Sequence, residues 1–533
     1  MRTKGLAIYI KQLVSSFPSM WLGVCLYPLL VLLLINPNPF DSRDIAILVV
    51  WLALVFALYS LIKQRWVWVI GLIYLCIDAA LNLLHIVFIH GPVSANSLFV
   101  VANTNAGEAS EFVQLKSTYD YWFILFFFSL VLWTIRYRYN KPIVFWNKPM
   151  ASLVLGACFI FLAENARHQR FVRKALLPST RAFISFAETQ THFLQQQPRV
   201  RKQVQVNALR NKPEVVILIL GESLTRRHMQ LYGYGRATNP LLLKRKDLIV
   251  YHKAVSPYSH TLTALLSAFT TANIDNQQAY DSSLSVLDVY ASAGYKTYWL
   301  SNQSPAGLWD NAIYRLAQTA NKQEFINRQG NTSFDATLQT SYDEDLIPFL
   351  NQALLDTASK KFIVVHLMGN HSLYEKRYPP QLNYFTEESN NKQHTINTYD
   401  NAVRYNDFVM NTFFDAISQK ANRNTNTHYA LCYWSDHGEN VYDENDAVGH
   451  DYTGLVPWTQ IEVPFMLWLS NNHPLKSSLA PHQQTLFMTD DVFHSLLDLG
   501  GLRTATYDST RSIFHRSFNA QRPAKLEDGN VYR

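Results

Sequence analysis

Charge is scarce in this chain, and cysteine is scarcer. Only 16% of the 533 residues are charged, below the roughly 25% of an average soluble protein. The chain has four cysteines, too few for a small fold stapled by disulfides. Its 19 glycines and 21 prolines exclude a collagen-like repeat. Because 48% of the residues are hydrophobic, a disordered chain is excluded as well.

The few charges are unevenly distributed. Residues 1–163 contain 11 Lys and Arg and 6 Asp and Glu, whereas residues 164–533 contain the remaining 36 and 34. The first part is therefore membrane-like and the second part globular. The formal net charge of +7 divides into +5 and +2. The globular part is thus nearly neutral, and we expect no binding to nucleic acid.

The cysteines are placed where they can do little chemistry. Cys25, Cys76 and Cys158 lie in apolar stretches, and Cys432 alone lies in the globular part, within Ala430–Trp434. That part can form no internal disulfide and holds no zinc motif built on cysteine. Cys432 is predicted to be a buried, inert thiol.

Five apolar segments of the first part are candidate membrane spans, for which about 20 residues are needed. They are Phe17–Ile35, Ile45–Ile62, Trp66–Ile89, Tyr121–Ile135 and Pro149–Leu162. The last two are short and need flanking residues to complete a span. The first is interpreted as an anchor, because no small-residue cleavage site follows it. Residues 1–163 are therefore predicted to form a membrane domain of five helices.

The loops between these segments predict an orientation. Short loops on one side hold nine Lys and Arg, and those on the other side hold two, Arg43 and Lys116. Because cytoplasmic loops are enriched in Lys and Arg, the amino terminus is predicted to be cytoplasmic. With five spans, the globular part then lies outside the cytoplasm.

Polar residues occur at one place inside the predicted spans. Asp78, Asn82 and His85 are spaced four and three apart, on one face of the third segment. Polar groups in lipid usually face a bundle interior. An internal hydrogen-bonded cluster is the preferred interpretation, and an ion or proton path is the alternative.

Residues 164–213 are predicted to connect the two parts. This stretch has ten Lys and Arg, two Asp and Glu, and apolar residues between the cations. Such a pattern is typical of an amphipathic segment lying at a membrane surface. A solvated linker helix is equally compatible with it.

The globular part, residues 214–533, alternates apolar runs with helical patterns. The runs are Val215–Leu220, Thr297–Leu300, Phe362–Leu367, Ala430–Trp434 and Phe465–Leu469. Helical patterns such as Leu284–Ala293 and Thr398–Ile417 separate them. This alternation predicts a three-layer α/β fold with a mostly parallel central sheet between helix layers.

Acids and imidazoles follow three of the predicted strands. Glu222 follows the first, His371 follows the Phe362 strand, and Asp436 and His437 follow the Ala430 strand. Ligand sites in such folds lie at the carboxyl ends of the strands, although an acid there can simply cap a helix. Two carboxylates with an imidazole suit zinc, with manganese as the harder alternative.

A hydroxyl nucleophile can come from the segment Tyr258–Thr263. It precedes Ala264–Phe269, which is predicted to be helical. A Thr at a helix amino terminus lies at the positive end of the dipole, which favours an alkoxide and a bound phosphate. The alternative for any one of these threonines is a plain helix cap.

The ordered set of motifs resembles the phosphoethanolamine transferases of Gram-negative inner membranes. That family includes colistin-resistance enzymes and belongs to the alkaline phosphatase/sulfatase superfamily. The matching stretches are Val216–Ser223, Leu231–Tyr234, Thr238–Pro240, Ser259–Thr270, Gly369–His371, Arg377–Pro379, Tyr399–Asn401, Ser435–Glu439 and Gly449–His450. The resemblance implies an α-helical membrane domain followed by an alkaline-phosphatase-like catalytic domain in the periplasm.

The resemblance also implies roles for single residues. Glu222, Asp436 and His437 match the metal ligands of the family, and Thr261 matches the nucleophile that also contacts the metal. Thr261 is preferred to Thr263 because its spacing to the following apolar residues fits the helix of the family better.

Further positions match contacts to substrate or to a second metal. His371 and His450 resemble histidines that bind a second metal or the phosphoryl group, and Asn302 and Ser304 fall where the family has polar substrate contacts. Glu108 matches an acid in the loop before the fourth segment, where it is thought to meet the ethanolamine amine.

The implied reaction takes phosphoethanolamine from phosphatidylethanolamine to lipopolysaccharide core, lipid A or a periplasmic glucan. Diacylglycerol leaves, and a phospho-threonine type intermediate forms. The implied cofactor is one tightly bound zinc ion, with a second zinc ion as an option and manganese less favoured, and a monomer is expected. Members that modify lipid A contain several disulfides in this domain, which favours a glycan acceptor here.

Other functions fit parts of the same pattern. A phosphoglycerol transferase would share the five spans and the Thr nucleophile. A phosphodiesterase or sulfatase would release its product to water, although sulfatases need a Cys or Ser precursor that Thr261 does not supply. A membrane sensor or transporter with an inactive hydrolase domain is supported only by the polar cluster at Asp78.

Overall fold

The computed structural model forms two compact units. The described residues are 24, 26–28, 30–31, 42–62, 65–89, 93, 98, 118–136, 147–166, 176–194, 199–210, 214–276, 278–280, 282–303, 312–327, 341–372, 374–445, 448–450, 456–479 and 481–532. One unit covers residues 1–102, 113–193 and 452–454, and the other covers 103–112, 194–451 and 455–533. The unit boundary near residue 193 lies inside the predicted connector.

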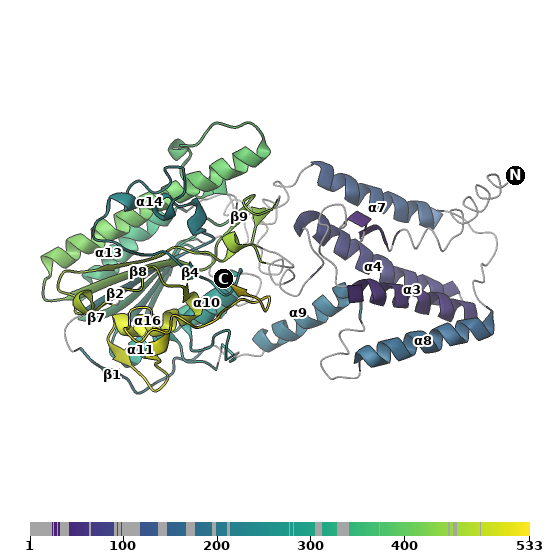
Figure 1. Cartoon of the computed structure of the whole chain (residues 1–533), viewed down its shortest axis with the longest axis horizontal. Coiled ribbons are helices and arrows are strands. Elements are labelled where there is room, and N and C mark those ends of the chain that lie inside the picture. Colours follow the sequence, from purple (N-terminus) through teal and green to yellow (C-terminus); the bar gives the residue numbers. More distant parts are fainter. Residues whose placement is uncertain are drawn as a thin grey trace. The chain divides into compact units, whose positions relative to one another are not determined.

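The first unit is helical. Its described helices include α3 (Ser42–Ile62), α4 (Arg65–Ile89), α7 (Thr118–Arg136), α8 (Lys148–Ala166) and α9 (Pro178–Leu194) (Figure 1). Helix α3 packs against α4 and α8, and α4 packs against α7. Many large apolar side chains point outward, as expected of helices whose outer surface meets lipid. They include Ile70, Ile73, Leu125, Phe126, Leu132, Leu153, Phe159 and Ile160.

Four of the five predicted spans coincide with these helices, namely α3, α4, α7 and α8. The remaining one, Phe17–Ile35, lies mostly outside the described residues. Among described residues, one helix, Ile45–Ile62, is long and apolar enough by itself to cross a membrane. Three shorter apolar helices accompany it, so the five-span topology stays a prediction.

The polar cluster of the third predicted span is bonded within the first unit. The Asp78 carboxylate accepts hydrogen bonds from the Ser179 N–H, at 3.0 Å, and from the Ser179 hydroxyl, so it caps the start of α9. The Asn82 amide donates to the Asp78 carbonyl at 2.9 Å. These contacts favour the internal hydrogen-bonded cluster over an ion path.

The second unit is built on a seven-stranded sheet. Its strand order is β3-β11-β8-β2-β7-β5-β6. The bounds are β2 (Glu214–Gly221), β3 (Ile249–Tyr251), β5 (Lys296–Ser301), β6 (Lys322–Phe325), β7 (Lys360–His366), β8 (His428–Ser435) and β11 (Phe465–Leu469). Strands β8, β2, β7, β5 and β6 run parallel. Strand β11 is antiparallel to both β8 and β3.

Helices cover both faces of this sheet. On one side lie α13 (Ile347–Leu355) and α14 (Asn391–Arg423), and on the other lie α10 (Thr261–Phe269), α11 (Val286–Ser292) and α16 (Val492–Leu499) (Figure 1). Every residue of β2 and β8 is buried, which explains why their sequences are apolar runs rather than alternating patterns. The predicted three-layer arrangement is therefore present.

Smaller elements complete the second unit. The described short helices and strands include α12 (Ala312–Ala317), α15 (Leu475–Ser478), β1 (Asn207–Ala208), β4 (Ala254–Val255), β9 (Asn440–Val441), β10 (Val448–Gly449), β12 (Phe487–Met488), β13 (Leu502–Arg503), β14 (Ala524–Lys525) and β15 (Val531–Tyr532). Cys432 is buried in β8, and burial raises the pKa of its thiol. It is free, as are the described Cys76 and Cys158.

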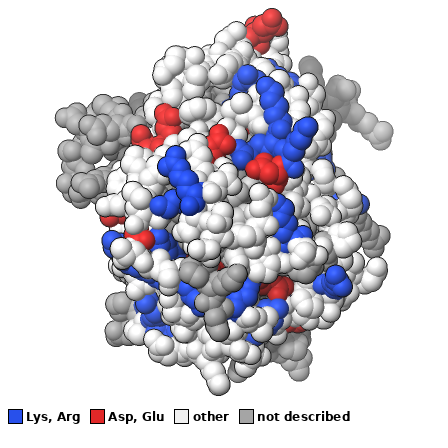
Figure 2. Space-filling view, turned by 90° about the vertical axis from the view of Figure 1, so that its left-hand side faces the viewer, with Lys and Arg blue, Asp and Glu red and all other residues white. Residues whose placement is uncertain are grey.

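Acidic and basic side chains mix on the face of the second unit that Figure 2 shows. Groups of Lys and Arg are separated by uncharged residues, and Asp and Glu lie between them. No extended surface of one charge sign is visible among the described residues of this face.

A buried histidine ties the segment after β2 to helix α14. The Nδ1 atom of His228 lies 2.6 Å from Asp400 Oδ1, and its Nε2 atom lies 3.0 Å from Asp443 Oδ1. Burial alone would lower the pKa of His228, but hydrogen bonds to the two carboxylates and their charges raise it to about 9. His228 is therefore charged in the folded protein at neutral pH.

This pair of contacts predicts a pH-dependent contribution to stability. In the unfolded chain the pKa of a histidine is about 6.5, so between that value and about 9 the folded state binds the extra proton. The stabilisation is complete below the unfolded pKa and is lost as pH rises through the folded pKa. His228→Gln should therefore lower the free energy of unfolding strongly at pH about 6 and much less at pH about 10. Urea unfolding of both proteins across this range measures it, and a penalty independent of pH would contradict the assignment.

Candidate active site

Two adjacent parallel strands deliver the predicted carboxylates to one edge of the sheet. The register pairs Gly221 of β2 with Ser435 of β8. Glu222 and Asp436, each one residue further along, therefore leave the sheet side by side. Strand β7 pairs with β2 on its other side and brings Gly369 and His371 to the same edge. The expectation that ligands gather at carboxyl strand ends is met by this register.

The first residue of α10 completes the group. The hydroxyl oxygen of Thr261 lies 3.2 and 3.4 Å from the two carboxylate oxygens of Glu222, and 3.1 Å from Nε2 of His437. The same Nε2 lies 3.3 Å from Glu222 Oε1 and 3.4 Å from Asp436 Oδ2. The structure thus brings together all four residues predicted to surround a metal ion.

A hydrogen bond from the second ring nitrogen fixes the orientation of His437. Its Nδ1 lies 2.8 Å from the carbonyl oxygen of Gly438, and because a carbonyl only accepts, Nδ1 carries a proton and donates. The other ring nitrogen, Nε2, is thereby aimed at the two carboxylates and the Thr261 hydroxyl. Metal-binding histidines are oriented in this way by a partner of the second ring nitrogen.

The buried carboxyl groups of Glu222 and Asp436 favour a positive charge in the site. Asp436 Oδ1 accepts from the Ser223 and His437 N–H groups at 3.2 and 2.7 Å, whereas Oδ2 is buried and has no hydrogen-bond partner among the described residues. Burial and the neighbouring Glu222 raise the pKa of Asp436 to about 8. Burial lowers the pKa of His437, but Asp436 and Glu222 outweigh it and raise that pKa to about 10.

These values indicate that the group fits a divalent cation. Without a cation, protons on both His437 and Asp436 offset the negative charge of the two buried carboxyl groups at neutral pH. One atom each of Glu222, Asp436 and His437 lie within 4.8 Å of one another. Two carboxylate oxygens and one imidazole nitrogen, with a hydroxyl alongside, form a donor set that zinc accepts.

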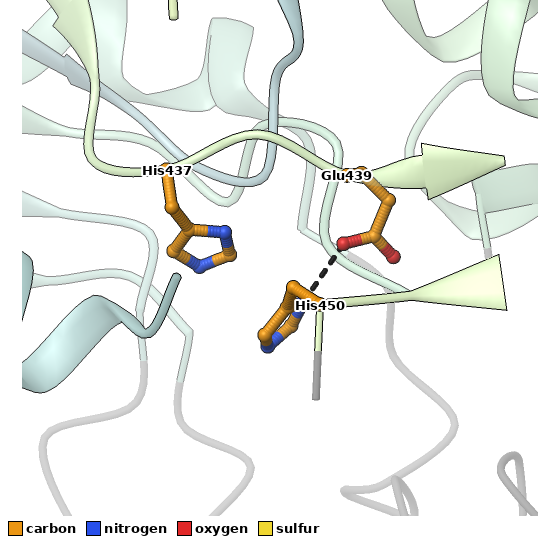
Figure 3. Close-up of side chains that lie close together, drawn as sticks. All are labelled: His437, Glu439 and His450. Atoms are coloured by element: carbon orange, nitrogen blue, oxygen red, sulfur yellow. Dashed lines mark hydrogen bonds and ion pairs between the residues drawn. The ribbon is translucent and has the colours of Figure 1, made fainter. Parts of the chain in front are cut away.

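A second group of possible ligands adjoins the first. His437, Glu439 and His450 also place ligand atoms within 4.8 Å of one another (Figure 3). Glu439 Oε2 lies 2.8 Å from His450 Nδ1, and its Oε1 accepts a hydrogen bond from the Tyr374 hydroxyl at 2.7 Å. The rings of His437 and His450 are 4.3 Å apart between centroids. The predicted histidine at 450 thus lies beside the metal group.

Two other predicted site residues, His371 and Asn302, lie on segments that follow β7 and β5. His371 follows β7, and its charge helps to lower the pKa of Glu222, against the opposing effect of burial and after the larger effect of His437. The Asn302 amide donates to Asp343 Oδ1 at 2.8 Å, and Asp343 in turn accepts the N–H groups of Met368 and Gly369. Asn302 therefore supports the loop after β7, and its role as a substrate contact stays a prediction.

Two predicted residues lie outside the described part of the chain. They are Ser304 and Glu108. Their assignments as substrate contacts stay predictions.

The two candidate threonines differ in what their hydroxyl groups contact. Thr263 donates to the carbonyl of His260, within its own helical turn, at 3.2 Å. The Thr261 hydroxyl instead faces Glu222 and His437. This geometry favours Thr261 as the nucleophile, an assignment that stays a prediction.

Sequence reasoning did not identify some of the supporting residues. Ser435 accepts from the Leu224 N–H and donates to the His437 carbonyl, so it joins the two ligand-bearing turns. Tyr374 holds Glu439. Glu439 carried a signal, because it directly follows Asp436-His437-Gly438. Tyr374 carried none, because its partner lies 65 residues away.

Comparison with known proteins decides the family. Residues 214–502 match the family model described as Sulfatase, which is more than half of the chain. The chain belongs to the sulfatase family. Within this family its resemblance to the phosphoethanolamine transferases is confirmed by curated relatives.

Three of these relatives show the extent of the likeness. Phosphoethanolamine transferase EptC of Escherichia coli K12 is 31% identical over 334 residues, which cover 58% of this chain and 54% of EptC. CptA of Salmonella typhimurium LT2 is 31% identical over 332 residues, with 57% and 54% covered. EptA of E. coli K12 is 28% identical over 393 residues, 68% of each chain. The match to the first two spans about half of their length.

Solved structures extend the comparison to the fold. The C-terminal periplasmic domain of E. coli EptC in complex with zinc is 29% identical, covers 62% of this chain and 94% of that domain, and has a TM-score of 0.56. The integral membrane EptA of Neisseria meningitidis is 19% identical, covers 93% and 98%, and has a TM-score of 0.69. The predicted fold, amino-terminal helices followed by an α/β domain, is confirmed by this second likeness.

A glycine controls how closely the loops of the site approach. Gly369 has φ +55°, and a Cβ added there would lie 2.7 Å from the backbone oxygen of Glu222 and 2.8 Å from its nitrogen. The next residue, Asn370, donates its N–H to that same oxygen at 2.9 Å. Only glycine allows the loop after β7 to lie directly against Glu222.

Gly369→Ala should therefore damage both stability and metal binding. We expect a loss of at least about 2 kcal/mol in the free energy of unfolding, because the backbone of Glu222 must shift. Gly235→Ala is the matched control: its Cβ would enter open space, and its effect should stay within about 0.5 kcal/mol. Denaturant unfolding and zinc titration of both variants test this. Equal, small effects would show that the close approach is unimportant.

Proposed function

We propose that this protein is a phosphoethanolamine transferase that uses phosphatidylethanolamine as donor and a periplasm-facing glycan or glycolipid as acceptor. The observation that carries the proposal is the convergence of the Thr261 hydroxyl with Glu222, Asp436 and His437 at the carboxyl edge of the sheet. The likeness to EptC, CptA and EptA supports the choice of transferred group.

Zinc is the proposed cofactor, held by Glu222, Asp436 and His437 with Thr261 alongside. The donor set and its demand for positive charge support this choice, as does the zinc in the EptC domain structure. When bound, the ion lowers the pKa of a neighbouring hydroxyl and stabilises charge on a phosphoryl oxygen. His371 and His450 are proposed to contact the phosphoryl group or a second ion.

In the donor half-reaction, the Thr261 oxygen attacks the phosphorus of phosphatidylethanolamine. The new bond joins Oγ1 to phosphorus as the bond from phosphorus to the diacylglycerol oxygen breaks. The hydroxyl proton leaves Thr261, and one proton is returned to the departing diacylglycerol. Thr261 begins α10, where backbone N–H groups and the helix dipole favour the phosphoryl oxygens.

In the acceptor half-reaction, a hydroxyl or phosphate oxygen of the acceptor attacks the same phosphorus. The bond to Oγ1 breaks, an attacking hydroxyl gives up its proton, Thr261 takes up one proton, and phosphoethanolamine remains on the acceptor. This two-step exchange follows the logic of covalent catalysis. Lipopolysaccharide core, lipid A and periplasmic glucans are the acceptor classes we propose.

The proposed location follows from the donor. A lipid substrate requires the site to work at a membrane, and the apolar helix Ile45–Ile62 fits such an attachment. We propose that the chain is a multi-pass inner-membrane protein and a monomer, with a cytoplasmic amino terminus and a periplasmic catalytic domain. Glu108 is proposed to meet the ethanolamine amine.

The covalent step predicts a specific adduct. Purified full-length protein mixed with phosphatidylethanolamine should carry phosphoethanolamine on the peptide that spans residues 261–270, as seen by mass spectrometry after digestion. Thr261→Ala should lose this adduct and at least about 1000-fold of transfer activity, because the nucleophilic oxygen is gone. Thr263→Ala is the matched control and should retain it. An adduct that survives in Thr261→Ala would move the nucleophile to Thr263.

The acceptor is identified by comparing cells with and without this protein. Mass spectrometry of lipopolysaccharide and of periplasmic glucans should show a phosphoethanolamine increment on one of them only when the active protein is present. Cells with Thr261→Ala serve as the control for expression. A glycerol phosphate increment instead would replace the proposed donor with a phosphoglycerol lipid, and free phosphoethanolamine without a modified acceptor would indicate a hydrolase.

A further inference from the structure

The turn that follows β2 has an unusual backbone. Ser223, next to the proposed ligand Glu222, has φ +53°, in the left-handed region that residues other than glycine rarely adopt. Strained positions of this kind persist only where their surroundings hold them. The Ser223 hydroxyl donates to Glu222 Oε1 at 2.9 Å, so the groups that hold this turn bear on the metal site.

Three consecutive N–H groups of the turn are bound by side chains. Ser223 N–H donates to Asp436 Oδ1 at 3.2 Å, and Leu224 N–H donates to the Ser435 hydroxyl at 3.0 Å. Both acceptors come from the end of β8. The third, Thr225 N–H, donates to the hydroxyl of Tyr399 at 3.0 Å.

Tyr399 makes a second contact with the same turn. Its hydroxyl donates to the Ser223 carbonyl at 2.8 Å, so one oxygen atom bridges Ser223 and Thr225. Tyr399 is fully buried in α14, far along the chain from both ligand-bearing strand ends. The rings of Tyr374 and His228 pack edge-on against it, with centroids 4.9 and 5.1 Å away. It therefore has little freedom to move.

The two residues after Tyr399 hold further loops. Asp400 accepts hydrogen bonds from His228 and from the Tyr234 hydroxyl, the latter at 3.0 Å, and pairs with Arg236. The Asn401 side-chain oxygen accepts the N–H groups of Tyr384 and Phe385, both at 2.9 Å. Tyr399-Asp400-Asn401, one of the motifs noted in the sequence, thus attaches three separate loops to one helix. The proposed reaction assigns no step to this motif.

We propose that Tyr399 is a positioning residue for the metal site. Its hydroxyl holds Ser223 in the left-handed conformation, and this presets Glu222 beside Asp436 before a cation binds. The inference rests on the proposed function only through the metal site and is independent of donor and acceptor. Loss of the hydroxyl should weaken cation binding even though Tyr399 lies behind the ligands.

The test measures zinc affinity of the full-length protein by competition with a chromogenic chelator. Tyr399→Phe should bind zinc about 10- to 100-fold more weakly, the usual cost of removing a group that orients a ligand. Tyr290→Phe is the matched control, because it also removes a buried hydroxyl that donates to a backbone carbonyl, that of Leu496, at 2.6 Å in another part of the domain. It should lower the melting temperature without changing zinc affinity.

A second pair of variants separates positioning from general damage. Glycine adopts φ +53° without strain, but Ser223→Gly also removes the hydroxyl that donates to Glu222 Oε1. The effect of Tyr399→Phe is therefore measured against Ser223→Gly alone, where it should shrink to less than about threefold. If Tyr399→Phe by itself fails to fold, the double variant with Ser223→Gly is measured in its place, because glycine removes the backbone strain at position 223. The absorption spectrum of the cobalt-loaded protein provides a further readout, since it reports ligand geometry and should change in Tyr399→Phe but not in Tyr290→Phe.

Each outcome bears on the proposal. Wild-type zinc affinity and an unchanged cobalt spectrum in Tyr399→Phe would overturn it. A loss of affinity that is equally large with and without the Ser223→Gly substitution would also overturn it, because Tyr399 would then act by another route. Failure of the wild-type protein to transfer phosphoethanolamine would refute the proposed function but leave these binding measurements interpretable.

Discussion

Two buried carboxylates that share one small space are the constraint on which the rest of this structure depends. Glu222 and Asp436 are both about 1% exposed, and His437 Nε2 lies within 3.4 Å of each. Oxygen atoms of the two carboxylates lie within 4.8 Å of each other. Like charges at that distance repel strongly where water is excluded. The arrangement is stable only when this negative charge is offset, either by protons on His437 and Asp436 or by a bound cation. The site is therefore built around a charge that the two carboxylates themselves do not provide.

The fold holds the two carboxylates together through strand pairing, a left-handed backbone and a close contact between loops. The last two features usually lower the stability of a protein. Parallel pairing of β2 with β8 fixes the two strand ends at the same height. The left-handed backbone of Ser223 and the close approach of Gly369 then place the side chains. Strain and close contacts of this kind are concentrated at functional sites, where the surrounding structure compensates for them. Here the compensation comes from hydrogen bonds donated or accepted by Tyr399, Ser435 and Asp343.

The buried strands and the acids at their carboxyl ends could be predicted from the sequence, because each is marked by a short local pattern of residues. An apolar run such as Val215–Leu220 indicates a strand buried on both faces, and an acid directly after it indicates a site. The antiparallel direction of β11 could not be predicted, because Phe465–Leu469 is an apolar run like the strands that run parallel to one another, such as β2 and β8. Tyr374 was missed, and Ser435 was noted only as part of the stretch Ser435–Glu439, because hydrogen bonds between distant segments leave no periodic pattern in the chain.

The proposed metal site would account for bond breaking at phosphorus but does not by itself account for transfer. A phosphorylated threonine beside a cation is open to attack by any oxygen nucleophile, water included. In the proposed reaction, the nucleophile of the second step must therefore be selected outside Thr261 and the three residues around it, by the groups that bind the acceptor and exclude water. The loops after β5, β7 and β8 leave the parallel sheet at the same edge as the proposed nucleophile, and loops tolerate change more readily than the strands that fix the ligands. Acceptor choice can thus change while the bond-breaking geometry stays constant.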